Sequence, residues 1–291
     1  MQPASGYRIV KLANGVHSVH SLAHRETFHP VIGPIAEAEA LYIRQIRLLE
    51  RLQDHSGEFV IWDVGLGAAA NALTVLRATR QIPCALRLVS FDHTLEPAQF
   101  ALQHTEALEY LSGYESRLEE LIVDRHLEFK DGEQHVQWDL HVADFPTLLR
   151  QTHAQRIPKP HVIMFDAFSP AKNPAMWTQP LFADLFRLLD PKCPCVLPTY
   201  SRSTMMRVTL LLAGFFVGAG HATGEKDETT IAANDLALLS DPLDARWLQR
   251  ARRSTSAEPL WEPVYRQAPL SEESWQKLEK HPQFGQVEKG L

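Results

Sequence analysis

From residue 58 onward the sequence alternates short apolar runs with segments of helical character. The runs have the length and composition of buried strands, and they cover residues 59–62, 86–91, 140–142, 161–165 and 195–197. The helical segments cover residues 71–79, 97–111, 180–189 and 203–213. Buried strands joined by helices predict an α/β fold with a doubly wound parallel sheet, closed by a hairpin of 215–217 and 230–233. Ligands of such sheets bind beyond the carboxyl ends of the strands.

The segments before and after the alternating strands and helices have a different sequence pattern. Asn14-Gly15 is a strong hairpin signal, and the apolar periodicity of residues 35–52 predicts one amphipathic helix. The last fifty residues are rich in proline, tryptophan and charge. We therefore predict three parts, which are an N-terminal hairpin and helix appendage at 1–52, a Rossmann-like domain at 53–240 and a C-terminal extension at 241–291.

The composition excludes several classes of protein. The 291 residues include 45% hydrophobic ones, so extensive disorder is excluded. The longest nearly uncharged apolar run, 208–220, is shorter than the ~20 residues that span a bilayer, and we recognise no signal peptide. Three cysteines form no disulfide framework, so we expect a cytoplasmic protein without a membrane partner. The net charge of −6 argues against nucleic-acid binding through the overall field but leaves a local basic patch open.

The sharpest motif is the turn after the first buried run, Asp63-Val64-Gly65-Leu66-Gly67-Ala68-Ala69-Ala70. Its glycines permit a tight turn and the close approach of a ligand, and the following helix offers free N–H groups. The spacing also satisfies a dinucleotide-binding pattern. Asp63 distinguishes between a dinucleotide and another ligand at this turn. Its carboxylate would repel a pyrophosphate but suits an amino-bearing ligand such as the methionine part of S-adenosylmethionine. We predict that Asp63, Gly65 and Gly67 bind this cofactor.

Two further carboxylates follow the next predicted strands. Asp92 closes the second strand, where a carboxylate can accept hydrogen bonds from both ribose hydroxyls, and Asp144 follows the third, where it suits an adenine amino group. Each one alone is more often a helix cap or a solvated loop residue than a ligand-binding group. Three carboxylates at successive strand ends favour a nucleoside cofactor. An NAD-dependent oxidoreductase would leave Asp63 without a role.

The segment after the fourth strand resembles a known family. Residues 166–177 read Asp-Ala-Phe-Ser-Pro-Ala-Lys-Asn-Pro-Ala-Met-Trp. They are similar to the D-G-F-x-P-x-K-N-P-x-M-W stretch of the methyltransferase domain of MnmC, the bifunctional tRNA 5-methylaminomethyl-2-thiouridine enzyme. The clear departure is Ala167, which stands where the family has glycine. The resemblance runs from about residue 14 to about residue 255, and it implies a class I S-adenosylmethionine-dependent methyltransferase fold.

Two other segments carry the same resemblance. The family turn E-x-G-F-G-T-G-L-N extends the predicted cofactor site to Asn71, while Ala69 replaces its third glycine. The residues 26–34 and Glu37 resemble the stand-alone members, which carry E-T-Y-H-S-x-x-G and then a glutamate. We find no flavin-binding stretch, so we expect the stand-alone form without the oxidase half.

The resemblance implies a specific chemistry. It implies N-methylation of an aminomethyl group on the wobble uridine, in the anticodon region of tRNA, with S-adenosylmethionine as donor. An amine must lose a proton before it attacks a methyl group, and we expect Asp166 to orient the amine and accept that proton. A carboxylate also favours the ammonium form of the amine, and the positive charge of Lys172 would offset this effect or hold a tRNA phosphate.

Aromatic and basic residues near this segment are candidates for contact with the substrate. Phe168 and Trp177 would stack on an extruded base, or pack within their own loop. Tyr200 and Arg202 follow the fifth strand and face the expected site, where Arg202 would touch phosphate or pair with a nearby acid.

The remaining candidates concern partners. Arg246, Arg250 and Arg253 share a helical face with Trp247 beside them, which predicts either a backbone-binding stripe or a solvated helix. The N-terminal histidines have no metal-ligand spacing, so we expect no metal. A separate oxidase or aminomethyl-installing partner is expected. Two alternatives stay open, a methyltransferase acting on a small primary amine and a noncatalytic protein that binds nucleosides or RNA.

Overall fold

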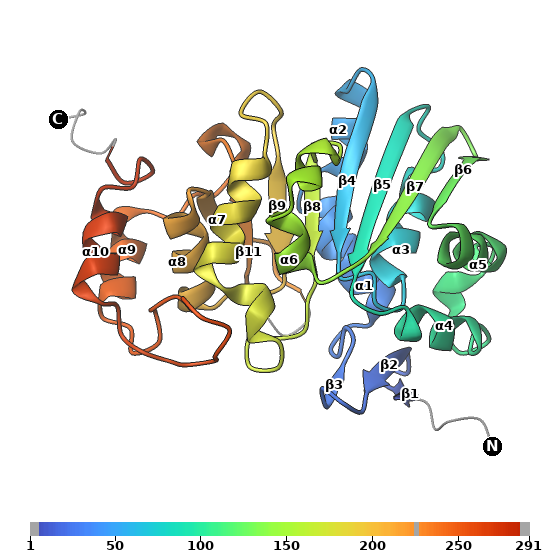
Figure 1. The fold of residues 1–291 in the computed structure, drawn as a ribbon, viewed down its shortest axis with the longest axis horizontal. Helices are drawn as coiled ribbons and strands as arrows, with labels where there is room; N and C mark the ends of the chain where they lie inside the picture. Colours follow the sequence, from blue (N-terminus) through green and yellow to red (C-terminus); the bar gives the residue numbers. More distant parts are fainter. Residues whose placement is uncertain (1–5, 224–226, 286–291) are drawn as a thin grey trace. The chain divides into compact units, whose positions relative to one another are not determined.

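The computed structural model describes residues 6–223 and 227–285 (Figure 1). The chain divides into two compact units. The first unit comprises Met1–Phe145, Val162–Phe168 and Ala222–Asp227. The second comprises Pro146–His161, Ser169–His221 and Glu228–Leu291. The glycine turn and the three predicted carboxylates at the strand ends all lie in the first unit.

The sheet of the first unit has the strand order β8-β4-β5-β7-β6. Four strands run parallel, and they are β4 (Glu58–Val64), β5 (Ala85–Asp92), β7 (Gln134–Val142) and β8 (Val162–Phe165). The apolar runs predict β4, β5 and β8 closely, whereas the predicted strand 140–142 covers only the last three residues of β7. The edge strand β6 (His126–Asp131) pairs antiparallel with β7 and was not predicted. Its buried residues alternate with exposed ones, so it lacks the continuous apolar run of a strand buried on both faces.

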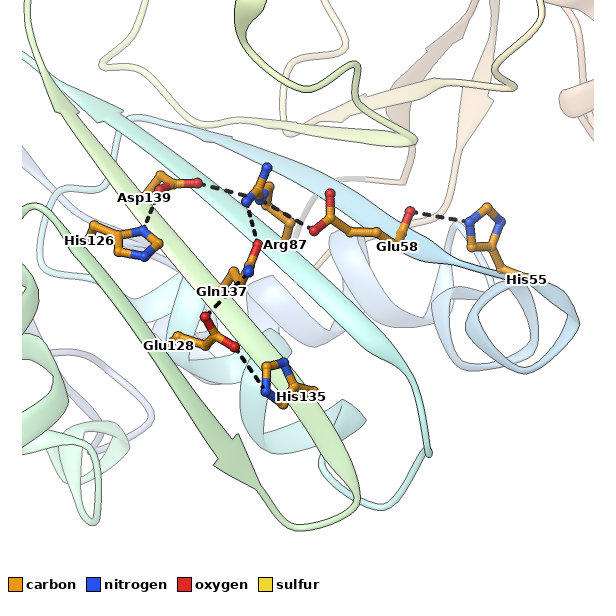
Figure 2. A network of polar contacts seen from close by, with 8 residues as sticks. All are labelled: His55, Glu58, Arg87, His126, Glu128, His135, Gln137 and Asp139. Carbon is orange, nitrogen blue, oxygen red and sulfur yellow. Dashed lines mark hydrogen bonds and ion pairs between the residues drawn. The ribbon is translucent and has the colours of Figure 1, made fainter.

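A polar network covers one part of this sheet and explains the alternation in β6 and β7 (Figure 2). Arg87 lies 3.4 Å from Glu58 and 3.6 Å from Asp139, joining β4, β5 and β7 by ion pairs. His126 lies 2.7 Å from Asp139 and binds β6 to the same cluster. Arg87 and Asp139 are half-buried and Glu58 is exposed, so solvent screens these ion pairs, which contribute ~0–1 kcal/mol each.

Helices of the first unit follow the predicted pattern with one correction. The helix α3 (Ala70–Thr79) follows the glycine turn, and α5 (Glu115–Asp124) packs against β6 and β7. The predicted helix 97–111 is wrong beyond residue 102: α4 (Glu96–Leu102) ends there, and the 3-10 helix η2 (Glu109–Leu111) follows after turns. The ring of His104 contacts the Phe100 carbonyl at 2.8 Å through Nδ1, which competes with the helical backbone hydrogen bond for that oxygen.

The N-terminal segment forms a three-stranded antiparallel sheet and a broken helix. The predicted hairpin is present as β1 (Tyr7–Lys11) and β2 (His17–Ser21), and a short third strand β3 (Glu26–Thr27) pairs with β2. The prediction of one helix over 35–52 is wrong. Three pieces replace it, α1 (Pro34–Ala38), the π-helix η1 (Glu39–Arg44) and α2 (Leu48–Asp54). Arg47 is in the left-handed conformation with φ of 51°, which breaks the helical spacing before α2.

The second unit contains an antiparallel sheet of order β10-β11-β9. The predicted closing hairpin is present as β10 (Phe216–Gly220) and β11 (Thr229–Ala233), and β9 (Val196–Thr199) pairs with β11. The two predicted helices appear as α7 (Gln179–Leu188) and α8 (Thr204–Ala213). The remaining elements are α6 (Phe145–Leu149), η3 (Thr152–Arg156), η4 (Pro174–Trp177), η5 (Leu236–Leu238), α9 (Ala245–Arg252) and α10 (Glu272–Glu279).

The long apolar run 208–220 does not form a single element. It is divided between α8 and β10, and Gly214 ends the helix in the left-handed conformation with φ of 107°. Across residues 6–223 and 227–285, no helix combines the length and apolarity needed to cross a bilayer.

Candidate active site

The turn after β4 is shaped by three alternate residues with positive φ, Gly65, Gly67 and Ala69. Gly65 has φ of 99°, and its N–H donates to the Phe91 carbonyl at 2.9 Å. A Cβ atom at this glycine would lie 2.8 Å from the backbone oxygen of Asp166. The turn therefore requires glycine at this position, because it runs directly against the segment that follows β8.

Ala69 departs from the family glycine but keeps the glycine-like conformation. It caps α3 with φ of 64° and ψ of 12°, and its side chain is buried. A non-glycine residue in this region costs ~1–2 kcal/mol. The alanine thus adds strain at the turn and leaves its left-handed geometry in place.

Asp63 is a buried acid at the end of β4. Its Oδ2 accepts a hydrogen bond from Ser90 at 2.8 Å, and the Ser90 oxygen in turn accepts one from the Trp138 indole at 2.9 Å. Its Oδ1 is buried with no hydrogen-bond partner among the described residues. Burial raises the pKa of Asp63 to about 7, against the opposing Ser90 hydrogen bond and with help from the charges of Asp166 and Asp92. A donor or cation placed at Oδ1 would satisfy this oxygen and favour the ionised form.

Asp92 links the end of β5 to the glycine turn. Its Oδ2 accepts the Gly67 N–H at 2.9 Å, and its Oδ1 accepts the Thr94 N–H at 3.2 Å. His93 lies 3.2 Å from the same Oδ1, and this contact raises the pKa of His93. A carboxylate oxygen has two lone pairs, so Oδ2, which accepts the Gly67 N–H, can also accept a hydrogen bond from a ligand hydroxyl. Asp144 follows β7, two residues beyond its last residue, and is exposed.

Asn71 and Asp166 meet across the turn. The Asn71 amide donates to Asp166 Oδ2 at 2.7 Å, and the Asp166 N–H donates to the Val64 carbonyl at 3.0 Å. Asn71 Oδ1 is buried, and no described residue donates to it. The carboxylate after β8 is therefore held beside the turn, where residues 71 and 166 come together from distant parts of the sequence.

His29 and Glu37 complete this group, although the sequence analysis gave neither a role. His29 Nε2 lies 3.6 Å from Asp166 Oδ2, and its Nδ1 lies 3.5 Å from Glu37 Oε1. Burial alone would lower the pKa of His29, but the carboxylates of Asp166 and Glu37 outweigh it and hold the pKa above its usual value. Both residues match the pattern of the stand-alone family members, and this match is the sequence feature that could have indicated a role for them.

Phe168 lies within an aromatic group of the first unit. Its ring stacks on His24 with centroids 4.0 Å apart and meets Phe28 edge-to-face at 5.3 Å. Its side chain is half-buried. The ring therefore already has aromatic partners, and a base would have to join or replace them.

The other predicted residues belong to the second unit. Trp177 is fully buried and meets Tyr200 edge-to-face at 5.9 Å, which agrees with the packed alternative for this tryptophan. Lys172 and Arg202 are exposed. In α9, Arg246 and Arg250 are exposed, as is Arg253 just beyond the helix, but Trp247 is 5% exposed. The ring of Trp247, a candidate for base stacking beside the arginine stripe, is thus packed inward and not available for that role.

Histidine, cysteine and acidic side chains form no group of three or more that would hold a metal ion within residues 6–223 and 227–285. The four N-terminal histidines contact different residues. For example, the ring of His20 contacts Thr27 and the ring of His24 contacts Ser21.

Comparisons with known proteins find methyltransferases that resemble this chain. The family described as S-adenosyl-L-methionine-dependent methyltransferase matches residues 109–235. The bifunctional protein MnmC of Pseudoalteromonas atlantica is 28% identical over 229 residues, which cover 74% of this chain and 32% of the relative. The MnmC of Aeromonas hydrophila is 30% identical over 213 residues, which cover 67% of this chain and 30% of the relative. The chain thus spans about a third of the length of these relatives.

A solved structure matches nearly the whole chain. The crystal structure of MNMC2 from Aquifex aeolicus superimposes with a TM-score of 0.66, at 23% identity, over 95% of this chain and 84% of that one. This likeness shows that the two chains share a fold.

Proposed function

Because this chain belongs to the S-adenosyl-L-methionine-dependent methyltransferases related to MnmC, we propose that it methylates the aminomethyl nitrogen of the modified wobble uridine in tRNA. The class I methyltransferase fold and the cofactor are as the sequence predicts. The observation that carries the proposal is the Asp166 carboxylate, held by Asn71 at 2.7 Å directly beside the glycine turn. This arrangement supports Asp166 as the acceptor of an amine proton beside the expected cofactor site.

The residues present fit the cofactor. Asp63 Oδ1 and Asn71 Oδ1 are buried without a donor among the described residues, and the amino group of the cofactor's methionine part would supply donors to them. Asp92 would receive the ribose hydroxyls, and Asp144 the adenine amino group. Gly65 and Gly67 would leave room for the backbone to approach the ligand. When bound, the cofactor supplies an electrophilic methyl group on a sulfonium sulfur.

The protein would contribute mainly by position and by proton removal. Methyl transfer needs the amine nitrogen and the methyl carbon ~3–3.5 Å apart and in line with the departing sulfur. Asp166 would orient the amine through a hydrogen bond and accept its proton as the nitrogen attacks. Lys172 would weaken the preference of this carboxylate for an ammonium ion, or hold a tRNA phosphate.

Contacts with tRNA would come from exposed arginines and from the aromatic group at Phe168. Arg202, Arg246, Arg250 and Arg253 are all exposed and suit phosphate oxygens. A net charge of −6 makes modest, salt-sensitive affinity the expected result. The same charge, together with the buried rings of Trp177 and Trp247, favours one alternative, a small primary amine as methyl acceptor.

The identity of the product tests this proposal. The protein is incubated with S-adenosylmethionine labelled in its methyl group and with tRNA whose wobble aminomethyl group lacks its terminal methyl. The tRNA is then digested and its nucleosides are analysed by mass spectrometry. We expect a labelled methylaminomethyl uridine. Tight cofactor binding without this nucleoside would argue for the small-amine alternative.

Cofactor binding is expected to release a proton from Asp63. With its pKa at about 7, Asp63 is about half protonated at pH 7. A bound ammonium group favours the carboxylate, so binding lowers this pKa and expels the proton. Affinity should therefore fall as the pH falls below 7, and proton release should vanish near pH 9. Calorimetry in buffers of different ionisation enthalpy measures the release. An equal release by Asp63→Asn would rule out Asp63 as its source.

A further inference from the structure

His29 lies behind Asp166 and is more deeply buried than it. The side chain of His29 is 8% exposed, as is that of Glu37, whereas that of Asp166 is 16% exposed. The imidazole contacts both carboxylates through different ring atoms, with Nε2 3.6 Å from Asp166 Oδ2 and Nδ1 3.5 Å from Glu37 Oε1. Because Asp166 is the most exposed of the three, we expect a substrate to contact its carboxylate before the imidazole.

The backbone around His29 holds its ring in this place. His29 is in the left-handed region with φ of 49°, immediately before Pro30, a conformation that costs energy outside glycine. The preceding segment is anchored to β2, because the Phe28 N–H donates to the Val19 carbonyl and the Ser18 hydroxyl donates to the Phe28 carbonyl. Glu37 is buried on α1, which packs against α3. Strained backbone that the surroundings hold in place is typical of functional sites.

The proton affinities of the three groups favour transfer of a proton from Asp166 to His29. An imidazole binds a proton more tightly than a carboxylate, with reference pKa values of ~6.5 and ~3.9. The two flanking carboxylates raise the pKa of His29 further, in spite of its burial. A proton that reaches Asp166 is therefore more stable on His29, where it also separates two negative charges.

We propose that His29 is the final acceptor of the proton that the substrate amine loses, acting through Asp166, and that Glu37 positions and stabilises the protonated ring. This inference rests on the proposed function. In the step, the amine nitrogen forms a bond to the methyl carbon while the carbon–sulfur bond breaks and leaves its electron pair on sulfur. The amine proton passes to Asp166 Oδ2 while the Asp166 carboxylate is restored by transfer of a proton to His29 Nε2.

This arrangement removes a difficulty that Asp166 alone would create. A lone carboxylate stabilises the ammonium form and so opposes deprotonation of the amine. With neutral His29 behind it, the carboxylate transmits the proton instead of retaining it. The ion-pair distances of 3.5 and 3.6 Å would shorten when substrate binds, as catalytic contacts commonly do.

The inference makes the methyl-transfer rate depend on the charge of His29. The charged groups that act on its ring are Asp166 after β8 and Glu37 on α1, while Asp63 at the end of β4 acts on Asp166. Only the neutral imidazole accepts a proton, so the rate should rise with pH through a value above ~6.5. Glu37→Gln removes one negative charge, which lowers the pKa of His29 and moves this rise to lower pH.

The experiment compares the full-length wild type with His29→Gln, Glu37→Gln and the control His17→Asn. His17 is a half-buried histidine on β2 of the N-terminal sheet, the strand to which the segment before His29 is anchored. Single-turnover methyl transfer to aminomethyl tRNA is measured from pH 5 to 9, and the imidazole resonances of the cofactor-free proteins are titrated by NMR. We expect His29→Gln to lose ~10²-fold in rate and the pH-dependent rise. Glu37→Gln should shift both the rise and the NMR titration of His29 to lower pH, and His17→Asn should change neither.

The outcomes separate the two proposals. A wild type that forms methylated tRNA, together with a His29→Gln variant of unchanged rate and pH profile, would overturn the role of His29 alone. An NMR shift in Glu37→Gln without a shift in the rate profile would do the same, and it does not depend on the folding of His29→Gln. A wild type that methylates no tRNA would overturn the proposed function and this inference with it.

Discussion

Replacing Asp166 with asparagine is expected to lower the rate of methyl transfer by ~10²–10⁴-fold, with cofactor affinity nearly unchanged. Asparagine has the same shape and can still accept the Asn71 hydrogen bond, which is 2.7 Å long in the wild type. It cannot accept the amine proton, so the loss should fall on the chemical step. Single-turnover kinetics at saturating cofactor measure that step, and calorimetry measures the affinity.

Asp124→Asn is the matched control for this change. Asp124 lies at the exposed end of α5, so the same substitution there leaves the carboxylates of the site intact. We expect wild-type kinetics from this variant. If Asp166→Asn also kept the full transfer rate with tight cofactor binding, Asp166 would not be the group that accepts the proton.

Replacing Gly65 with alanine is expected to destabilise the protein by ~2–3 kcal/mol and to abolish cofactor binding. Two effects add at this position. The backbone has φ of 99°, which disfavours any side chain, and the new Cβ would lie 2.8 Å from the Asp166 backbone oxygen. Relief of this contact would displace both the turn and the carboxylate of Asp166. Denaturant unfolding and cofactor calorimetry measure the two consequences.

Gly57→Ala separates the backbone strain from the close contact. Gly57 precedes β4 with φ of 95°, but a Cβ there has no heavy atom within 4 Å. We expect this variant to lose only ~1 kcal/mol and to bind the cofactor normally. Equal effects of the two substitutions on stability and binding would mean that the contact between the turn and Asp166 is unimportant.

Much of the fold could be predicted because its central strands are unbroken apolar runs. The strands β4, β5, β8 and β9 and the β10–β11 hairpin lie close to their predicted positions. Errors arose where one residue overrides a periodic pattern, as Arg47 does in the left-handed conformation before α2. A strand with one solvated face, such as β6, carries a different pattern and was missed.

The residues of the candidate site could likewise be predicted only in part. Asp63, Asp92 and Asp166 could be found because each follows a predicted strand, and the carboxyl ends of parallel strands lie at one edge of a sheet. The contacts of His29 could not be found in this way. Its partners Glu37 and Asp166 lie on different elements, and only the folded chain brings all three together.

The structure shows where some of the acidic residues behind the net charge of −6 are located. Asp63, Asp92, Asp166 and Glu37 gather around the turn and His29, so part of the acidity serves the proposed cofactor and amine site. The charge that argued against nucleic acid is therefore concentrated partly where a cationic cofactor would bind.

The most direct test of the account compares two methyl acceptors that carry the same aminomethyl uridine, one within tRNA and one as the free nucleoside. The ratio kcat/KM is measured for each with labelled S-adenosylmethionine at low and high salt. The account predicts a large preference for tRNA, with the label on the wobble nucleoside and a preference that weakens as salt screens the phosphates. Equal values for the two acceptors, unaffected by salt, would contradict it and identify a small-amine methyltransferase.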